Sequence, residues 1–274
     1  MKKVKSEKRK MENKKYNFRL LENKVCVIVG AASLRSIGYA TAELFAAHGA
    51  KLVLLDVVIN EQIANEIAAS IANEIGHTPE IMSIKCDICS TTDCDKAIEK
   101  AVSKFGTIDC LVNCAGIVKS GGMLSISESE YDTILDVNLK GTFNICKSAL
   151  KIFKEKQSGV IVNLASLAAQ RGGGLVGGAH YAASKGGVIS LTRSIAREFA
   201  PYGIRANVIC PAMIETSMLD GFTEQQLNDV ISTIPLKRVG KTIELAGTCL
   251  FLASNLSGFT TGATIDVNGG IHIH

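Results

Sequence analysis

The chain has 274 residues, of which 47% are hydrophobic, with 25 glycines, 4 prolines and no tryptophan, a composition that favours a compact α/β protein over a disordered one. The net charge of +4 comes from the N-terminus: residues 1–24 hold ten Lys or Arg and three acids, which leaves the remaining 250 residues at −3. The body of the chain is therefore not a nucleic-acid-binding surface, and we expect residues 1–21 to be a disordered basic extension.

Nothing in the sequence suggests a membrane or secreted protein. No apolar run approaches the roughly 18 residues needed to span a bilayer, and no apolar signal core follows the basic start Met1–Lys5. Nine cysteines without disulfide-like spacing fit a reducing cytoplasm. Cys86 and Cys89 are spaced like a metal-binding pair, but no second pair complements them, so we expect no metal site.

The first predicted strand and helix form a phosphate-binding unit. The apolar run 24–30 predicts a buried strand that ends at Gly30, and a helical pattern runs from Ile37 to about Gly49. Gly30 permits a tight turn, and Gly38 permits close packing where the helix begins. The free backbone N–H groups at that helix start would bind the pyrophosphate of a dinucleotide.

The second predicted strand indicates which dinucleotide is preferred. The apolar run 51–55 ends in Asp56, whose carboxylate can accept hydrogen bonds from ribose hydroxyls and would repel a 2′-phosphate. Arg35 instead favours NADP, because a basic side chain in the turn can bind that phosphate. We expect NAD to be preferred through Asp56, with NADP as the alternative.

Strands and helices alternate throughout, which predicts a single-domain, doubly wound parallel sheet of the Rossmann type over residues 22–274. Further helices are expected at 60–75, 91–105, about 128–155, 181–200 and 242–253, and further strands at 81–86, 108–112, 159–165, 204–210 and 264–267. The irregular segment 211–240, which contains one short helical piece, is predicted to be a lid.

Two hydroxyl groups and one ammonium group are predicted to meet after the strand at 159–165. Ser166 follows that strand, and Tyr181 and Lys185 are four residues apart, so they share one face of a helix. An ammonium group beside a phenol favours the phenolate and moves the tyrosine pKa down from about 10. Tyr181 could then protonate a carbonyl group that is hydrogen-bonded to Ser166.

Asn138 is a polar residue among apolar neighbours in the helix predicted over about 128–155. A buried amide needs hydrogen-bond partners. The residues alone support two interpretations equally, a bridging or capping amide and a catalytic one.

From about residue 22 to 274 the chain resembles a short-chain dehydrogenase/reductase, because eight features of that family occur in order. They are the turn Gly30–Gly38, Asp56, Asp87, Asn113-Cys114-Ala115-Gly116, Asn138, Ser166, the pair Tyr181 and Lys185, and Pro211-Ala212. The resemblance implies that Tyr181 is the acid/base and that Ser166 polarises the carbonyl. It also implies that Lys185 lowers the tyrosine pKa and holds the nicotinamide ribose, while Asn138 anchors a proton-relaying water.

The same resemblance implies which residues contact the dinucleotide. They are Gly30, Ser36, Ile37, Gly38, Asp56, Asp87, Ile88, Asn113, Ala115, Gly116, Tyr181, Lys185, Pro211 and Thr216.

Two departures from the family pattern affect the functional prediction. In the turn, Val29 replaces the usual Thr, Ser36 replaces the middle Gly, and two residues are inserted, which resembles the enoyl-thioester reductases of the superfamily. Those enzymes separate their Tyr and Lys by more than four residues, so ketone/alcohol chemistry is preferred here. Ala212 stands where Gly is common. An enoyl reductase and a catalytically silent dinucleotide-binding module remain the alternatives.

The substrate expected from the lid is an apolar or extended small-molecule ketone, with a 3-oxoacyl thioester as the first choice. The roof of the substrate pocket would be formed by apolar side chains of the lid, which are Met213, Ile214, Met218, Leu219 and Phe222. Arg171, Lys237, Arg238 and Lys241 could form a basic rim for an acidic carrier protein. The family resemblance also implies a homotetramer that buries the helices at 128–155 and 181–200.

Overall fold

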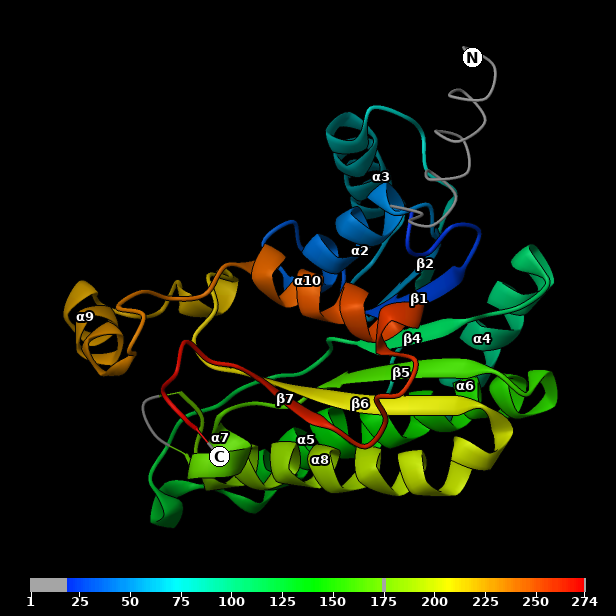
Figure 1. Cartoon of the computed structure of the whole chain (residues 1–274). Helices are drawn as coiled ribbons and strands as arrows, with labels where there is room; N and C mark the ends of the chain where they lie inside the picture. The colour runs from blue at the N-terminus through cyan, green and yellow to red at the C-terminus, as the bar shows by residue number, and fades with distance from the viewer. Residues whose placement is uncertain (1–18, 174–175, 274) are drawn as a thin grey trace, which may run out of the picture.

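A computed structural model describes residues 19–173 and 176–273, so that most of the predicted basic extension, residues 1–18, lies outside the described residues. Within the described residues the chain forms a seven-stranded parallel sheet with the order β3-β2-β1-β4-β5-β6-β7 (Figure 1). The strands are β1 (Val25–Val29), β2 (Lys51–Asp56), β3 (Ile81–Lys85), β4 (Cys110–Asn113), β5 (Gly159–Leu164), β6 (Ile204–Pro211) and β7 (Thr264–Val267). The doubly wound α/β fold is confirmed, and every predicted strand is present.

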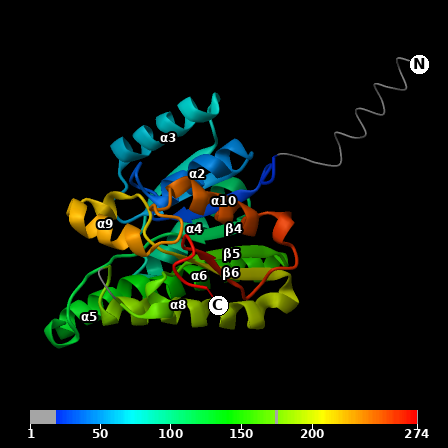
Figure 2. The same ribbon diagram turned by 60° about the vertical axis from the view of Figure 1, so that its left-hand side comes forward.

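Helices cover both faces of the sheet. The longer ones are α2 (Ile37–Ala47), α3 (Glu61–Ile75), α4 (Thr91–Phe105), α5 (Glu128–Leu135), α6 (Gly141–Lys156), α8 (Ala179–Phe199), α9 (Glu224–Thr233) and α10 (Thr242–Ala253), with a single turn α7 (Ala168–Arg171). In Figures 1 and 2, α2, α3 and α10 lie on one face, and α4, α5, α6 and α8 lie on the other. None of these described helices is long and apolar enough to cross a membrane.

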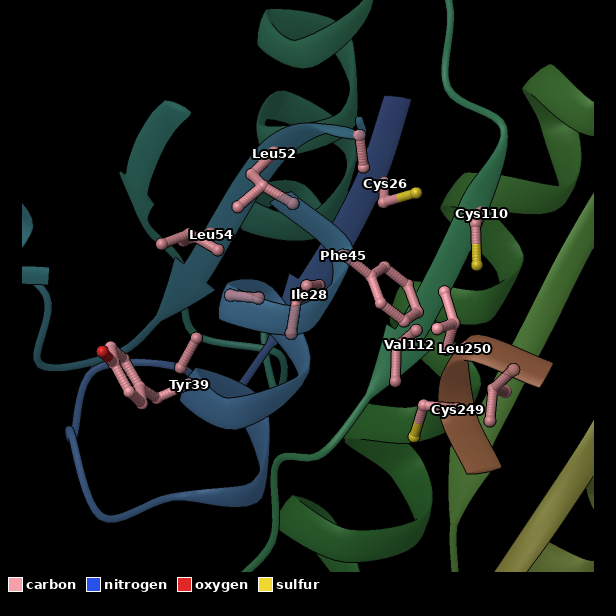
Figure 3. Packing of buried hydrophobic residues seen from close by; sticks show 14 of the residues in the cluster. Cys26, Ile28, Tyr39, Phe45, Leu52, Leu54, Cys110, Val112, Cys249 and Leu250 are labelled. Carbon is pink, nitrogen blue, oxygen red and sulfur yellow. The ribbon is translucent and has the colours of Figure 1, made fainter. Parts of the chain in front are cut away.

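The two helical layers explain why the strands read as continuous apolar runs. Alternate residues of β1 point to opposite faces, so Cys26 and Ile28 join the core under α2 and α10, while Val27 joins the core under α4 and α6. Figure 3 shows the first of these cores, in which the ring of Phe45 from α2 lies among side chains of β1, β4 and α10. Both faces of β1 are therefore apolar, whereas β4, β5 and β6 each carry one buried asparagine, Asn113, Asn163 and Asn207.

The strand register brings the candidate site residues to one edge of the sheet. Val29 of β1 pairs with Asn113 of β4, which pairs with Asn163 of β5, so these three strands end level with one another. The segments that follow them carry the predicted site residues. A single cleft at the carboxyl ends of the strands can therefore gather groups that lie far apart in the sequence.

The helix predicted over 128–155 differs from a regular α-helix. It is divided into α5 and α6 by a π-helical segment, η2 (Asp136–Lys140), in which the N–H of Gly141 donates to the carbonyl of Asp136. One extra residue is thereby accommodated within the helix. Hydrophobic spacing did not show this insertion, because a single added residue shifts the pattern only locally.

The segment 211–240 contains a short 3₁₀ turn, η4 (Ser217–Leu219), and α9. A backbone bridge between Ile214 and Gly240 joins the two ends of the segment. Figure 1 shows α9 standing out from the two helical layers, and none of its residues is fully buried. The segment is therefore attached at its base and exposed at its tip, as a lid would be.

Candidate active site

A cavity of about 890 Å³ lies at the carboxyl ends of the strands. Its walls include the turn after β1, the end of β2, the segment after β4, the segment after β5, the start of α8 and parts of the segment 211–240, which we call the lid. The sequence-predicted residues that line it are Gly30, Ser36, Ile37, Gly38, Asp56, Asp87, Ile88, Ala115, Gly116, Ser166, Tyr181, Lys185, Pro211 and Thr216. The structure therefore brings nearly all predicted site residues to one place.

The turn between β1 and α2 is packed as a close backbone cradle. Gly30 has a φ of +80°, and a Cβ atom there would lie 2.8 Å from the backbone nitrogen of Ala115. A Cβ atom at Gly38 would lie 2.2 Å from the carbonyl oxygen of Gly30. Ser36 caps α2 by accepting a hydrogen bond from the N–H of Tyr39 at 3.0 Å. The glycine cradle and the helix N-terminus behind it fit a dinucleotide pyrophosphate.

The Asp56 carboxylate is fixed at the end of β2 by two backbone groups. Its Oδ2 accepts from the N–H of Ala32 at 3.0 Å, and its Oδ1 accepts from the N–H of Val58 at 3.2 Å. Asp56 is half-buried and lines the cavity. The carboxylate is therefore oriented against the turn, where the resemblance places the adenosine ribose.

Ser166 and Tyr181 face each other across the cavity floor. Tyr181 is 8% exposed, and this burial raises the pKa of its phenol above the ordinary value, while a hydrogen bond with the Ser166 hydroxyl acts in the lowering direction. Gly177 makes room for the ring, because a Cβ atom there would lie 2.2 Å from Tyr181 Cδ1. The sequence did not predict this contact between Gly177 and the tyrosine ring.

Lys185 lies one helical turn beyond Tyr181 and is 5% exposed. Its Nζ donates to the carbonyl oxygen of Leu164 at 2.9 Å, and burial lowers its pKa to about 8. The sequence predicted that Lys185 would lower the pKa of Tyr181. In the structure the net shift of the tyrosine pKa is upward, because desolvation dominates, and the ammonium group is directed to the end of β5; lowering of this pKa by Lys185 stays a prediction.

Asn138 bridges two segments through its side-chain amide. Its Oδ1 accepts from the N–H of Ile117, and its Nδ2 donates to the carbonyl of Ile117, both at 2.9 Å. Nδ2 also donates to Ser184 Oγ at 3.0 Å, and Ser184 in turn donates to the carbonyl of Tyr181 at 2.7 Å. Both amide hydrogens are used, so the amide ties the segment after β4 to α8. That Asn138 anchors a proton-relaying water stays a prediction.

Asn113 is the one predicted cofactor-contacting residue that does not line the cavity. Its Nδ2 donates to Thr142 Oγ1 at 2.9 Å, and its Oδ1 accepts from the N–H of Ala115 at 3.2 Å. The side chain therefore shapes the loop that carries Gly116, at which a Cβ atom would lie 3.0 Å from Lys185 Nζ.

The apolar roof is formed partly by residues that the sequence did not indicate. Met213, Ile214, Met218 and Leu219 line the cavity as predicted, but Phe222 is not among the lining residues of the described chain. Val230, Thr233, Ile234 and Ile271 contribute in its place. The i, i+4 spacing of Val230 on α9 and Ile234, which directly follows α9, could have indicated this part of the wall. No local pattern pointed to Ile271 near the C-terminus.

The predicted basic rim is largely absent from the cavity. Arg171 lines the cavity and donates to the carbonyl of Ile271 at 3.1 Å. Arg238 forms an ion pair with Glu244 at 2.6 Å, and Lys237 donates to the carbonyl of Ser232 at 2.6 Å. These two side chains have partners of their own, which sequence proximity to the lid did not reveal.

The comparison with protein families agrees with the fold. Residues 30–272 match the profile of a family described as "Enoyl-(Acyl carrier protein) reductase". The chain is 41% identical, over 93% of its length and 100% of the relative, to an uncharacterised short-chain type dehydrogenase/reductase, y4mP, from Sinorhizobium fredii. The chain belongs to the short-chain dehydrogenase/reductase family, and it is an NAD(P)-dependent oxidoreductase of that type.

Other relatives and solved structures extend the comparison. The chain is 39% identical to the 3-oxoacyl-[acyl-carrier-protein] reductase FabG of Thermotoga maritima, over 92% of the chain and 99% of the relative. A short-chain dehydrogenase/reductase structure from Brucella melitensis, described as a glucose/ribitol dehydrogenase, has a TM-score of 0.82 at 40% identity and covers 93% of this chain and 99% of its own. The structure of gox2181 has a TM-score of 0.87 at 31% identity, with coverages of 93% and 98%.

Proposed function

We propose that the chain reduces a 3-oxoacyl thioester or a similar apolar ketone to the secondary alcohol, with NADH as the preferred reductant. The observation that carries the proposal is the convergence of Ser166, Tyr181 and Lys185 on one cavity with the glycine cradle and Asp56. When bound, the nicotinamide would supply the hydride. The reverse reaction, oxidation of the alcohol, uses the same groups.

Each catalytic side chain has a role that its environment supports. Tyr181 keeps its proton at neutral pH, because a phenol has a pKa of about 10 and burial shifts the pKa of this one further upward, so it can donate that proton to the carbonyl oxygen. The half-buried hydroxyl of Ser166 can hydrogen-bond the same oxygen and fix its position. Lys185, held at Leu164, would hold the nicotinamide ribose, and Asn138 would support the floor through Ile117 and Ser184.

The choice of substrate rests on the roof of the cavity. Met213, Met218, Val230 and Ile234 offer adaptable apolar surface and few groups that could bind the several hydroxyls of a polyol. The name of the Thermotoga maritima relative supports the same choice. The description of the Brucella melitensis structure supports a sugar or polyol instead, so the experiment must include both.

The enoyl-thioester alternative is favoured by two observations, the lengthened turn between Gly30 and Gly38 and the description of the matching family. Against it stands the spacing of Tyr181 and Lys185, which lie one helical turn apart on α8 and both line the cavity. This arrangement fits a ketone reductase, in which the phenol would donate a proton to the carbonyl oxygen that Ser166 hydrogen-bonds. Filled catalytic positions also argue against a silent binding module.

The test is a substrate panel followed by NADH absorbance. It compares acetoacetyl thioesters, sugar and polyol ketones, cyclic and steroid alcohols, and a crotonyl thioester. We expect the acetoacetyl thioester to be the best substrate. Polyol ketones turned over at least about tenfold faster would overturn the apolar assignment, a difference of about 1.4 kcal/mol in activation free energy. Activity on the crotonyl thioester alone would establish the enoyl alternative, and cofactor binding without any turnover would indicate a silent module.

Assembly and location form part of the same proposal. We expect a homotetramer built on α5, α6 and α8, and Phe143 on α6 is 47% exposed, as an interface residue would be in the separated chain. All nine cysteines are free thiols. This supports a reducing compartment such as the cytoplasm.

A further inference from the structure

The lengthened turn after β1 meets the lid at one arginine. Arg35 Nη1 donates to Asp220 Oδ2 at 2.9 Å, and Arg35 Nη2 donates to Asp220 Oδ1 at 2.7 Å, so the guanidinium and the carboxylate form a bidentate pair. Nη2 also donates to the carbonyl of Thr216 at 3.5 Å. Thr216 and Asp220 flank η4, and all three residues of η4 line the cavity. Arg35 therefore holds both ends of the lid turn that covers the cavity.

The backbone of Arg35 belongs to the same wall as Asp56. The N–H of Arg35 donates to Ser33 Oγ at 3.3 Å, and both Ser33 and Asp56 line the cavity. Glu215 adds a second carboxylate near the guanidinium and, with Asp220, raises the Arg35 pKa. The guanidinium of Arg35, which could otherwise bind a 2′-phosphate, is thus already paired with a carboxylate of the lid.

We propose that Asp220 is a specificity-determining residue that favours NADH over NADPH by holding the guanidinium of Arg35 on the lid. The inference rests on the proposed preference for NAD. A 2′-phosphate beside Asp56 would need a cation to offset repulsion by that carboxylate. Arg35 can serve only by leaving Asp220 and Thr216, so binding of NADPH would break the contacts that hold η4. Asp56 repels the phosphate, and Asp220 withholds the group that would compensate.

The test is a fluorescence titration of the full-length protein with NADH and with NADPH, which needs no carbonyl substrate. Asp220→Asn removes the charge with little change of shape. We expect it to tighten NADPH binding relative to NADH by up to about fivefold, because the freed guanidinium can bind the phosphate without first breaking an ion pair whose two side chains are each 57% exposed. Asp229→Asn is the matched control: it removes a carboxylate from α9 that accepts from Gln225, and the ratio of the two affinities should stay unchanged.

The role of Arg35 is tested in a double-mutant cycle. Adding Arg35→Ala to Asp220→Asn should abolish the gain in NADPH affinity, whereas Arg35→Ala alone should change the ratio much less. If Asp220→Asn weakens both cofactors equally, or if its gain persists without Arg35, the inference is wrong. A wild-type protein that binds NADPH more tightly would overturn the NAD assignment itself. Neither binding experiment depends on turnover of the acetoacetyl thioester, which is measured separately as the test of the proposed substrate.

Discussion

The ammonium group of Lys185 donates a 2.9 Å hydrogen bond to the backbone carbonyl of Leu164, two residues before Ser166. The end of β5 therefore both carries the candidate hydroxyl group and anchors the lysine. The charge of Lys185 is desolvated at this position, which lowers its pKa to about 8. That shift links the active site to the stability of the whole domain.

The first prediction concerns stability and pH. In the unfolded chain a lysine keeps its proton up to a pKa of about 10.4, whereas folded Lys185 loses it near pH 8. Between these two pKa values the unfolded state binds more protons than the folded state. Lys185 therefore makes the free energy of unfolding rise with pH in this range. Below about pH 8 the lysine is charged in both states, and the full cost of burying its charge is present.

We therefore expect the unfolding free energy of the Lys185 protein, minus that of Lys185→Met, to increase from pH 7 to pH 10 by on the order of 2–3 kcal/mol. Both proteins should carry Tyr181→Phe, which removes the titration of the neighbouring phenol. Denaturant unfolding at several pH values measures the difference. A difference that stays flat with pH would show that Lys185 is not desolvated.

The second prediction concerns the proton donor. Tyr181→Phe should abolish turnover and leave NADH affinity nearly unchanged, because only the hydroxyl is lost. Tyr131→Phe, on the exposed surface of α5, is the control and should keep full activity. Steady-state kinetics and NADH fluorescence separate the two effects. Retention of more than about a tenth of kcat, a loss below ~1.4 kcal/mol, would exclude the proton-donor role.

The third prediction follows from the raised pKa of Tyr181. Alcohol oxidation needs the phenolate as base, so its kcat/KM should rise with pH throughout the range from 7 to 9, by up to about tenfold per pH unit. Carbonyl reduction needs the neutral phenol and should not rise. An oxidation rate that is already independent of pH at pH 7 would mean that the phenol is ionised there.

The fourth prediction concerns the carboxylate at the end of β2. We expect kcat/KM to be higher with NADH than with NADPH, and Asp56→Asn should narrow the ratio because the repelling charge is removed. The Asn side chain has one acceptor oxygen, so it can keep the hydrogen bond from only one of the N–H groups of Ala32 and Val58. If NADPH is the better cofactor of the wild-type protein, Asp56 does not face the ribose.

The fifth prediction concerns assembly. Light scattering at micromolar concentration should give a tetramer, and deletion of residues 1–18 should change neither assembly nor turnover. The deletion stops before Leu21, because that side chain is 2% exposed and its N–H donates to the carbonyl of His48. A monomeric wild-type protein would contradict the tetramer, and a change caused by the deletion would assign the arm a role.

The parts of the fold that follow from local pattern could be predicted from the sequence. Buried parallel strands can be apolar on both faces, so runs such as 24–30 and 51–55 identified β1 and β2. The π-helical segment around Asn138 could not be predicted, since its extra residue is stabilised by tertiary contacts with Ile117 and Ser184. In the site, motif residues such as Tyr181 were placed correctly in the cavity. The pairing of Arg35 with Asp220 was not foreseen, because nothing local connects residues 185 positions apart.

The direction of the strands in the parallel sheet also determines which end of the chain can carry a tag or be fixed to a support. All strands begin at one edge of the sheet and end at the cavity edge, so the chain enters β1 on the side away from the cavity. The C-terminus behaves differently, because Ile271 lines the cavity wall. An affinity tag, a fluorescent reporter or a solid support should therefore be joined at the N-terminus. The same fusion at the C-terminus would place its linker at the mouth of the cleft.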